Sequence, residues 1–299
     1  MIRKKSVSTI LRRAAVADRL VHCFFYFIVA VFFVSCLLPF WLIIVNSFAQ
    51  PQDLIRGFSF WPEHWTLDTY EYLINHSRIM INFSNSVFIT VVGTGIAVVV
   101  SSMYAYGLAH PKIERRYTLS FLTYIPMILG SGLVGSYLLI VKYLHLKDSY
   151  WSMILPYIVN PFYVFIMISF FRALPYDIIE AAYMDGASDW RTFFQIVWPL
   201  SIIPTVTVTL FYALTYWNDW WLAMLYVNDT NKQPLQILIR NITSQREMAS
   251  MIGTANAGAI QPINVQLATV CMAIGPIILL YPFLQRYFVK GIIVGSVKG

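Results

Sequence analysis

Several apolar windows of about 20 or more residues, free of charged side chains, constrain this chain more than any other feature. A helix of that length can cross a hydrocarbon layer of roughly 30 Å, where only helices and closed barrels satisfy every backbone N–H and C=O. The composition agrees, because 58% of the residues are hydrophobic and only 12% are charged. We therefore predict an all-α polytopic membrane protein with six transmembrane helices.

The six predicted helices and their flanks form a single transmembrane domain, residues 1–299, with a tail at 1–19, a membrane core at 20–285 and a second tail at 286–299. The helices are expected at 20–45, 83–109, 117–141, 150–171, from an elbow near 180–204 to 227, and at 263–284. Long polar loops are expected at 46–80 and 228–262. The apolar run after the basic amino terminus is too long for a signal peptide and lacks a small-residue cleavage site, which favours a retained first helix.

Glycines and prolines inside these windows predict local features of the helices. Gly93, Gly95 and Gly107 are expected to permit close helix approach, because small residues drive helix packing in lipid. The same role is expected for the glycines of the third helix, which are Gly130, Gly132 and Gly135. Pro156 and Pro161 are expected to kink or interrupt the fourth helix.

The polar segment between the fourth and fifth predicted helices reads as helix, turn and helix. Pro175 suits a first-turn position, and Asp185-Gly186 ends the first short helix because glycine tolerates the left-handed exit conformation. Ser188, with Asp189, can cap the second helix. Apolar residues at helical spacing follow on both sides, namely Ile178, Ile179, Ala182, Trp190, Phe193, Phe194 and Val197. From the residues alone, such an elbow is either a helical surface loop or a socket for a partner protein.

The distribution of charge predicts the orientation of the chain in the membrane. The two tails, the link at 112–116 and the elbow carry 14 of the 21 Lys and Arg residues. Because positive charge favours the cytoplasmic side, we expect both termini and the elbow to face the cytoplasm. The net charge of +7 is explained by this bias, and it gives no argument for nucleic acid or for an anionic cargo.

Motifs for chemistry are missing from the sequence. The chain lacks the phosphate-binding pattern G-x-x-x-x-G-K-[ST], the H-E-x-x-H metal pattern and the G-x-S-x-G nucleophile pattern. The five histidines are scattered without metal-ligand spacing. We therefore predict no catalytic residues, no bound metal and no cofactor, so that energy for any transport must come from another subunit.

Aromatic and polar residues gather in the outer half of the fifth predicted helix. Aromatic rings can stack on sugar rings while Asn and Asp bind hydroxyl groups, so this cluster is a candidate for saccharide contact. An aromatic belt at the bilayer interface explains the same residues equally simply. The candidates for a translocation path are Tyr216, Trp217, Asn218 and Trp220, together with Asn85 on the second helix.

The elbow resembles the EAA motif of permease subunits of bacterial ABC importers. Glu180, Ala181, Ala182 and Gly186 match the start of that motif, and Ile196 and Pro199 match its end. The resemblance implies that the first short helix is a coupling helix that contacts a cytosolic ATPase, with Glu180, Ala181, Ala182, Asp185 and Gly186 as contact residues. The tail residues Gly291, Gly295, Lys298 and Gly299 are similar to the maltose-type permease class.

This resemblance implies a sugar importer of the bacterial inner membrane, with a homologous second permease, two ATPase subunits that bind ATP and Mg, and an external sugar-binding protein. Asn85 in the run NSVFIT and Asn218 in a W-N pair match family positions near the path. Pro234, Gln236 and Arg240 resemble a docking loop of the branch that takes oligosaccharides from complex polysaccharides such as alginate. The alternatives are a membrane scaffold whose elbow binds a partner other than an ATPase, and a membrane enzyme acting on lipid-linked sugars, which the missing acid, base and metal clusters disfavour.

Overall fold

The described residues form helices that are joined by turns and loops. The computed structural model describes residues 2–130, 132–252 and 263–278, and in these ranges the only β-type pairing is an isolated bridge between Ala49 and Trp65. The chain falls into two compact units, residues 1–70 with 257–271 and residues 71–256 with 272–299. Each unit is described by itself.

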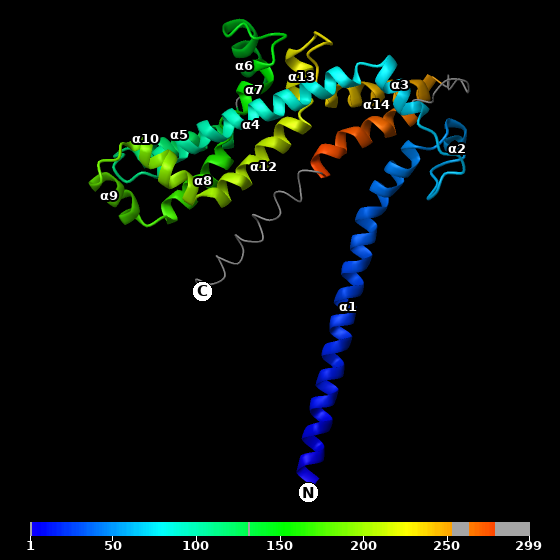
Figure 1. The fold of residues 1–299 in the computed structure, drawn as a ribbon, viewed down its shortest axis with the longest axis horizontal. Coiled ribbons are helices and arrows are strands. Elements are labelled where there is room, and N and C mark those ends of the chain that lie inside the picture. The colour runs from blue at the N-terminus through cyan, green and yellow to red at the C-terminus, as the bar shows by residue number, and fades with distance from the viewer. Residues whose placement is uncertain (1, 131, 253–262, 279–299) are drawn as a thin grey trace. The chain divides into compact units, whose positions relative to one another are not determined.

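The first unit contains the longest helix and the segment that follows it. Helix α1 covers Ile2–Ser47, and α2 covers Pro51–Ile55 (Figure 1). Asn46, fully buried, closes the following turn by donating to the carbonyl of Ser59 and accepting from its N–H. In this segment the Trp61 ring stacks on Trp41 and packs edge-on against Trp65. Helix α3, Asp68–His76, begins in this unit and continues into the second.

The second unit is built on α4, Ile79–Ala109, which packs along both α8 and α12 (Figure 1). Val98, Ala105, Val164, Met167 and Val208 are buried in their common core. The helices of this unit are α4, α5 Arg116–Leu129, α6 Leu133–Leu138, η1 Leu139–Tyr143, α7 Trp151–Ile154, η2 Leu155–Tyr157, α8 Pro161–Ala173, α9 Tyr176–Met184, α10 Asp189–Thr192, η3 Phe193–Val197, α11 Trp198–Leu200, α12 Ile202–Asn218, α13 Trp221–Tyr226 and α14 Leu235–Ile252.

Two helical stretches are long and apolar enough to cross a membrane as single rods, Val21–Ser47 and Ile79–Ala109. Three further pairs of helices meet that standard only when each bent pair counts as one span, so the described residues hold up to five spans. A shorter apolar helix, Ile263–Ile278, occupies the start of the sixth predicted helix. The rest of that helix and the tail motif at 291–299 lie outside the described residues.

The prediction of an unbroken third helix is wrong. Arg116–Leu129 and Leu133–Tyr143 meet at 110° across the glycine segment. Gly130 and Gly132 have φ of 65° and 68°, a left-handed conformation that glycine adopts at little cost, and an added Cβ at either would meet nothing within 4 Å. These glycines therefore permit a sharp break and do not form the close-packing surface that we expected.

The fourth and fifth predicted helices are also bent. The fourth is interrupted before Pro161 with a bend of 46°, which confirms the proline prediction, and Asn160 caps the second part by accepting from the N–H of Phe162. The fifth is not one rod, because Asp189–Leu200 and Ile202–Asn218 meet at 85° and α13 follows separately. The segment 228–262, expected to be a polar loop, contains the 18-residue helix α14.

Gly93 confirms the close approach predicted for the second helix. A Cβ at this position would lie 2.8 Å from Cζ of Tyr216, so the ring of α12 packs directly on the α4 backbone. Gly95 has open space beside it, and at Gly107 the nearest atom is 3.9 Å away. Of the three glycines, only Gly93 is required by a close contact.

Candidate functional site

The elbow is the first candidate site, and its shape follows from local hydrogen bonds. Asp185 caps α9, and Gly186 then takes φ of 78°. The N–H of Ala187 donates to the carbonyl of Ala182 at 2.9 Å, and the N–H of Gly186 donates to Tyr183 at 3.0 Å. This pair of bonds is a Schellman exit, which needs a residue that tolerates positive φ. The predicted stop at Gly186 is confirmed.

The next helix begins as the sequence predicted. Ser188 is its N-cap, and the Ser188 hydroxyl accepts from the N–H of Arg191. Pro175 lies one position before α9, as its N-cap, and not in the first turn as expected. Both ends of the turn are thus fixed by short-range interactions, which makes the elbow a defined shape in place of a loose loop.

The two faces of α9 differ sharply in exposure. Ile179 and Ala182 are 7% and 6% exposed, whereas Met184 is 84% exposed. Glu180, Ala181, Asp185 and Gly186 are exposed as well. Ile178 is 37% exposed, so it does not share the burial of Ile179 and Ala182. Ala182 also faces inward. It therefore contributes to packing and, through its carbonyl, to the hydrogen bond that ends α9, and it is not part of the exposed face.

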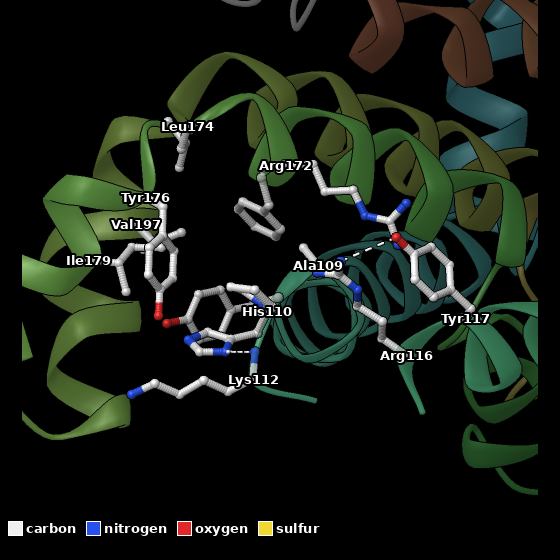
Figure 2. Close-up of a pocket in the computed structure, with 13 residues that line it drawn as sticks. Ala109, His110, Lys112, Arg116, Tyr117, Arg172, Leu174, Tyr176, Ile179 and Val197 are labelled. Atoms are coloured by element: carbon white, nitrogen blue, oxygen red, sulfur yellow. Dashed lines mark hydrogen bonds between the residues drawn. The ribbon is translucent and has the colours of Figure 1, made fainter. Parts of the chain in front are cut away.

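A chain of polar contacts connects the elbow to the end of α4. His110 Nε2 lies 3.2 Å from the Tyr183 hydroxyl, which donates to Asp189 Oδ1 at 2.7 Å. The backbone N–H of Lys112 donates to His110 Nδ1 at 3.2 Å (Figure 2). Because Nδ1 accepts, the proton of a neutral imidazole is on Nε2 and is directed to Tyr183. α4, α9 and α10 are therefore joined through one histidine and one tyrosine.

The environment of His110 favours the neutral ring. Burial lowers the pKa of His110, the nearby charges of Lys112 and Arg116 lower it further, and Asp189 opposes them. A protonated Nδ1 would also point a hydrogen at the N–H of Lys112. The unfolded chain therefore binds a proton at this histidine more readily than the folded chain does. The neutral His110 ring consequently favours the folded state above the unfolded pKa of about 6.5. The contribution is lost as the pH falls through the lowered folded pKa.

We expect the melting temperature of the purified protein to fall between about pH 7 and about pH 5, with part of that fall assigned to His110. His110→Gln should reduce the slope in this range, and fluorescence-detected melting at several pH values measures it. His22→Gln, at an exposed position on α1, is the matched control. Identical slopes for the wild type and His110→Gln would contradict the assignment.

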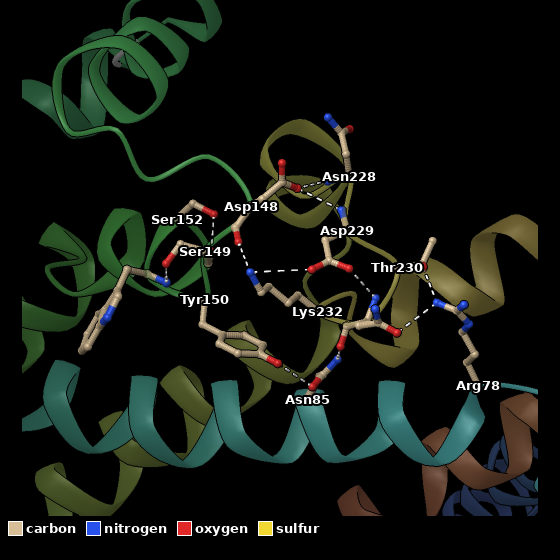
Figure 3. Close-up of polar contacts among 12 residues, drawn as sticks. Arg78, Asn85, Asp148, Ser149, Tyr150, Ser152, Asn228, Asp229, Thr230 and Lys232 are labelled. Atoms are coloured by element: carbon tan, nitrogen blue, oxygen red, sulfur yellow. Dashed lines mark hydrogen bonds and ion pairs between the residues drawn. The ribbon is translucent and has the colours of Figure 1, made fainter.

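The second candidate region lies at the opposite end of α4, where it holds the segment 228–234. Asn85 Nδ2 donates to the carbonyls of Asn231 at 2.8 Å and Gln233 at 3.0 Å, and Asn85 Oδ1 accepts from the Tyr150 hydroxyl at 2.9 Å (Figure 3). One turn earlier, Asn82 Nδ2 donates to the carbonyl of Gln233 at 3.0 Å. The amide of Asn85 therefore anchors this segment, and its role in a path stays a prediction.

Asp148 fixes the other side of the same segment. Its carboxylate accepts from the N–H groups of Asn228 and Asp229, and its carbonyl accepts from Lys232 Nζ at 2.9 Å (Figure 3). These backbone hydrogen bonds lower the pKa of Asp148. The non-glycine φ of 56° at Asp148 is compatible with this local bonding. The segment 228–234 is consequently held in one conformation at the start of α14.

The aromatic cluster of α12 is divided between buried and accessible residues. Tyr216 and Trp217 are 2% and 6% exposed, with the Tyr216 hydroxyl donating to Ile154 and Trp217 Nε1 donating to Ala273. Asn218 is exposed and Trp220 is half-buried. Within this chain Tyr216 and Trp217 serve helix packing, and the path assignments of all four residues stay predictions.

The predicted docking residues lie at the start of α14. Pro234 is buried, Gln236 is half-buried and Arg240 is exposed. The guanidinium of Arg240 lies over the Trp220 ring, 3.7 Å from its centroid. Arg240 has no carboxylate partner among the described residues. The Trp220 ring therefore holds an exposed cation in place at this end of the bundle.

Several residues of these sites escaped the sequence analysis. His110 and Tyr183 are 73 positions apart, and nothing local connects them. The only hints were a histidine at the end of an apolar helix and a tyrosine three residues after Glu180. Asp148 and Lys232 are 84 positions apart, and no local pattern connects them either.

Comparisons with known proteins agree with this architecture. The model of the family described as "binding-protein-dependent transport system inner membrane component" matches residues 6–294. The polygalacturonan/rhamnogalacturonan transport system permease protein YtcP of Bacillus subtilis (strain 168) is 38% identical over 288 residues, 94% of this chain and 99% of the relative. Protein LplC of the same organism is 39% identical over 265 residues, 88% of this chain and 90% of LplC.

A solved structure of a bacterial ABC transporter involved in the import of the acidic polysaccharide alginate contains a similar chain. The TM-score is 0.82 at 25% identity, covering 91% of this chain and 98% of the other. The bent helical bundle and these similarities define a polytopic transport permease of the inner membrane. The chain belongs to the family of binding-protein-dependent transport system inner membrane components, and it is a carbohydrate ABC importer permease, not an enzyme.

Proposed function

We propose that this chain forms half of the translocation path of a sugar importer and receives mechanical work from a cytosolic ATPase at α9. The observation that carries the proposal is the exposed face of α9, made of Glu180, Ala181, Met184, Asp185 and Gly186. A methionine that is 84% exposed on a rigid, capped turn favours a protein contact, because Met adapts to partner surfaces. The second permease and the external sugar-binding protein complete the proposed complex.

Movement of the elbow would reach the membrane helices through His110 and Tyr183. The hydrogen bond between them ties α9 to the end of α4, the helix that packs on both α8 and α12. A displacement of α9 by an ATPase would therefore pull on the centre of the bundle. The buried side chains of Ile179 and Ala182 support the same linkage by packing inward.

The sidedness and the partner can be tested with single cysteines. After replacement of the native Cys23, Cys36 and Cys271, Ser188→Cys should react with an impermeant maleimide only in opened cells. Asn228→Cys, exposed at the other end, should react in intact cells. Met184→Cys should cross-link to the ATPase. Labelling of Ser188→Cys in intact cells would refute the orientation, and a cross-link only to another protein would support the scaffold alternative.

For the cargo, we propose oligosaccharides from an acidic polysaccharide. The similarity to a permease named for polygalacturonan and to a transporter of alginate supports this class. Arg240 supports it independently, because a guanidinium binds a carboxylate and the Trp220 ring beneath it holds this guanidinium in place. The Arg240 guanidinium forms no ion pair with a carboxylate among the described residues.

We expect Arg240→Gln to reduce uptake of a uronic-acid oligosaccharide by roughly tenfold in proteoliposomes that contain the whole importer and its binding protein. Uptake of the same oligosaccharide after reduction of its carboxyl groups should change little. Arg56→Gln, which also removes an exposed positive charge, is the matched control. Equal losses for both cargoes, or no loss for either, would contradict a role for Arg240 in recognising charge.

A further inference from the structure

A cavity of about 570 Å³ lies beside the elbow, at the ends of α4, α5 and α8 (Figure 2). Its walls are apolar, formed by Ala109, Phe171, Leu174, Ile179 and Val197. Its rim is basic and is formed by Lys112, Arg116 and Arg172. An apolar interior with a cationic rim matches an amphipathic anion better than a free inorganic ion.

The two arginines of the rim converge on one aromatic ring. Arg116 Cζ lies 4.9 Å and Arg172 Cζ 5.8 Å from the centroid of the Tyr117 ring. Figure 2 shows both guanidinium groups beside Tyr117. Both side chains are cationic, so an anion that contacts both of them would relieve their mutual repulsion. The shared tyrosine positions the pair but does not neutralise it.

The described part of the chain supplies no anion for this rim. No carboxylate lies within 4.0 Å of Lys112, Arg116 or Arg172 among the residues that the structure describes. Arg172 donates one hydrogen bond, to the carbonyl of Leu108 at 3.3 Å, and Arg116 donates one, to the Tyr117 hydroxyl at 3.2 Å. A guanidinium has five N–H donors, so most of them are available to a ligand.

We propose that this cavity binds the phosphate headgroup of an anionic phospholipid. Arg116 and Arg172 bind the phosphate oxygens, Lys112 lies at the rim, and the apolar walls contact the glycerol backbone and the first acyl carbons. The cavity opens where three apolar helices end, which is the depth of lipid headgroups. Because Ile179 of α9 and His110 also line it, the lipid would contact the elbow and the end of α4 together.

The test uses the assembled importer in detergent and native mass spectrometry. Dioctanoyl phosphatidylglycerol, dioctanoyl phosphatidylcholine and inorganic phosphate are titrated separately. We expect phosphatidylglycerol to bind preferentially, and the double variant Arg116→Gln/Arg172→Gln to weaken that binding by about tenfold or more, since charge-assisted hydrogen bonds are lost. Arg115→Gln is the matched control, because Arg115 is in the same link but does not line the cavity.

Arg116→Gln alone guards against a double variant that does not assemble, since among the described residues its side chain loses contacts only with the hydroxyl and ring of Tyr117. Equal binding of phosphatidylcholine, or phosphatidylglycerol binding that is unchanged in either variant, would overturn the proposal. Inorganic phosphate that displaces phosphatidylglycerol at equal concentration would do the same by identifying a free-anion site. None of these results depends on whether the elbow contacts an ATPase.

Discussion

Gly186→Pro should abolish sugar-dependent ATP hydrolysis in the reconstituted importer, with a loss of at least about tenfold. The φ of Gly186 is 78°, whereas the proline ring fixes φ near −65°. Proline also removes the N–H that donates to Tyr183, so both the direction of the turn and one of its two closing bonds are lost. The exposed face of α9 would then be misdirected relative to the rest of the bundle. ATP hydrolysis in the presence of sugar and binding protein measures the effect.

Gly186→Asn is the control, because Asn tolerates positive φ and keeps its N–H. It should retain most of the coupled activity, whereas Gly186→Val should resemble the proline variant. Each variant must still purify with its partner subunits, which separates misdirected coupling from failure to assemble. Full coupled hydrolysis by an assembled Gly186→Pro importer would refute the proposed role of the elbow.

The elbow was predictable because its determinants are local. Gly186 and Ser188 act through bonds to residues within five positions, and such patterns can be read directly from the sequence. The all-helical, polytopic class was predictable for a similar reason, since long uncharged runs leave few alternatives. The similarities to known permeases confirm that class.

The remaining features depend on choices that a local pattern leaves open. A glycine in an apolar helix can serve either close packing or a break, and Gly130 and Gly132 serve a break. Helix α14 was missed because its polar residues excluded a membrane span, although Leu235, Leu238, Ile239 and Ile242 follow helical spacing. That amphipathic period was the available signal.

Long-range contacts of the candidate sites were beyond local reading. The partner of His110 is 73 positions away, and Asn85 binds a segment 146 positions away. The basic cavity likewise combines the link after α4 with the end of α8, so its three cations appeared in the sequence only as part of the orientation bias. Sequence reasoning singled out the elbow but not the long-range contacts beside it.

Gly93→Leu should prevent stable assembly, and Gly93→Ala should lower the melting temperature of the importer. The Cβ of alanine would lie 2.8 to 3.0 Å from three carbons of the Tyr216 ring, closer than normal packing allows. The ring cannot move away easily, because its hydroxyl donates to the carbonyl of Ile154 at 2.9 Å and the side chain is 2% exposed. Adding one methyl group to a well-packed core in this way costs about 1 to 3 kcal/mol of stability.

Gly95→Ala is the matched control, since an added Cβ there meets nothing within 4 Å. Replacing glycine by alanine raises helix propensity equally at both positions. A difference in melting temperature between the two variants therefore isolates the contact of α4 with α12. Tyr216→Leu should partly rescue Gly93→Ala, whereas Tyr216→Phe should not, because the crowded atoms belong to the ring. Equal melting temperatures for Gly93→Ala and Gly95→Ala would show that α4 and α12 can separate at this point without loss of stability. In that case a pull on the end of α4 would not be transmitted to α12 through Gly93.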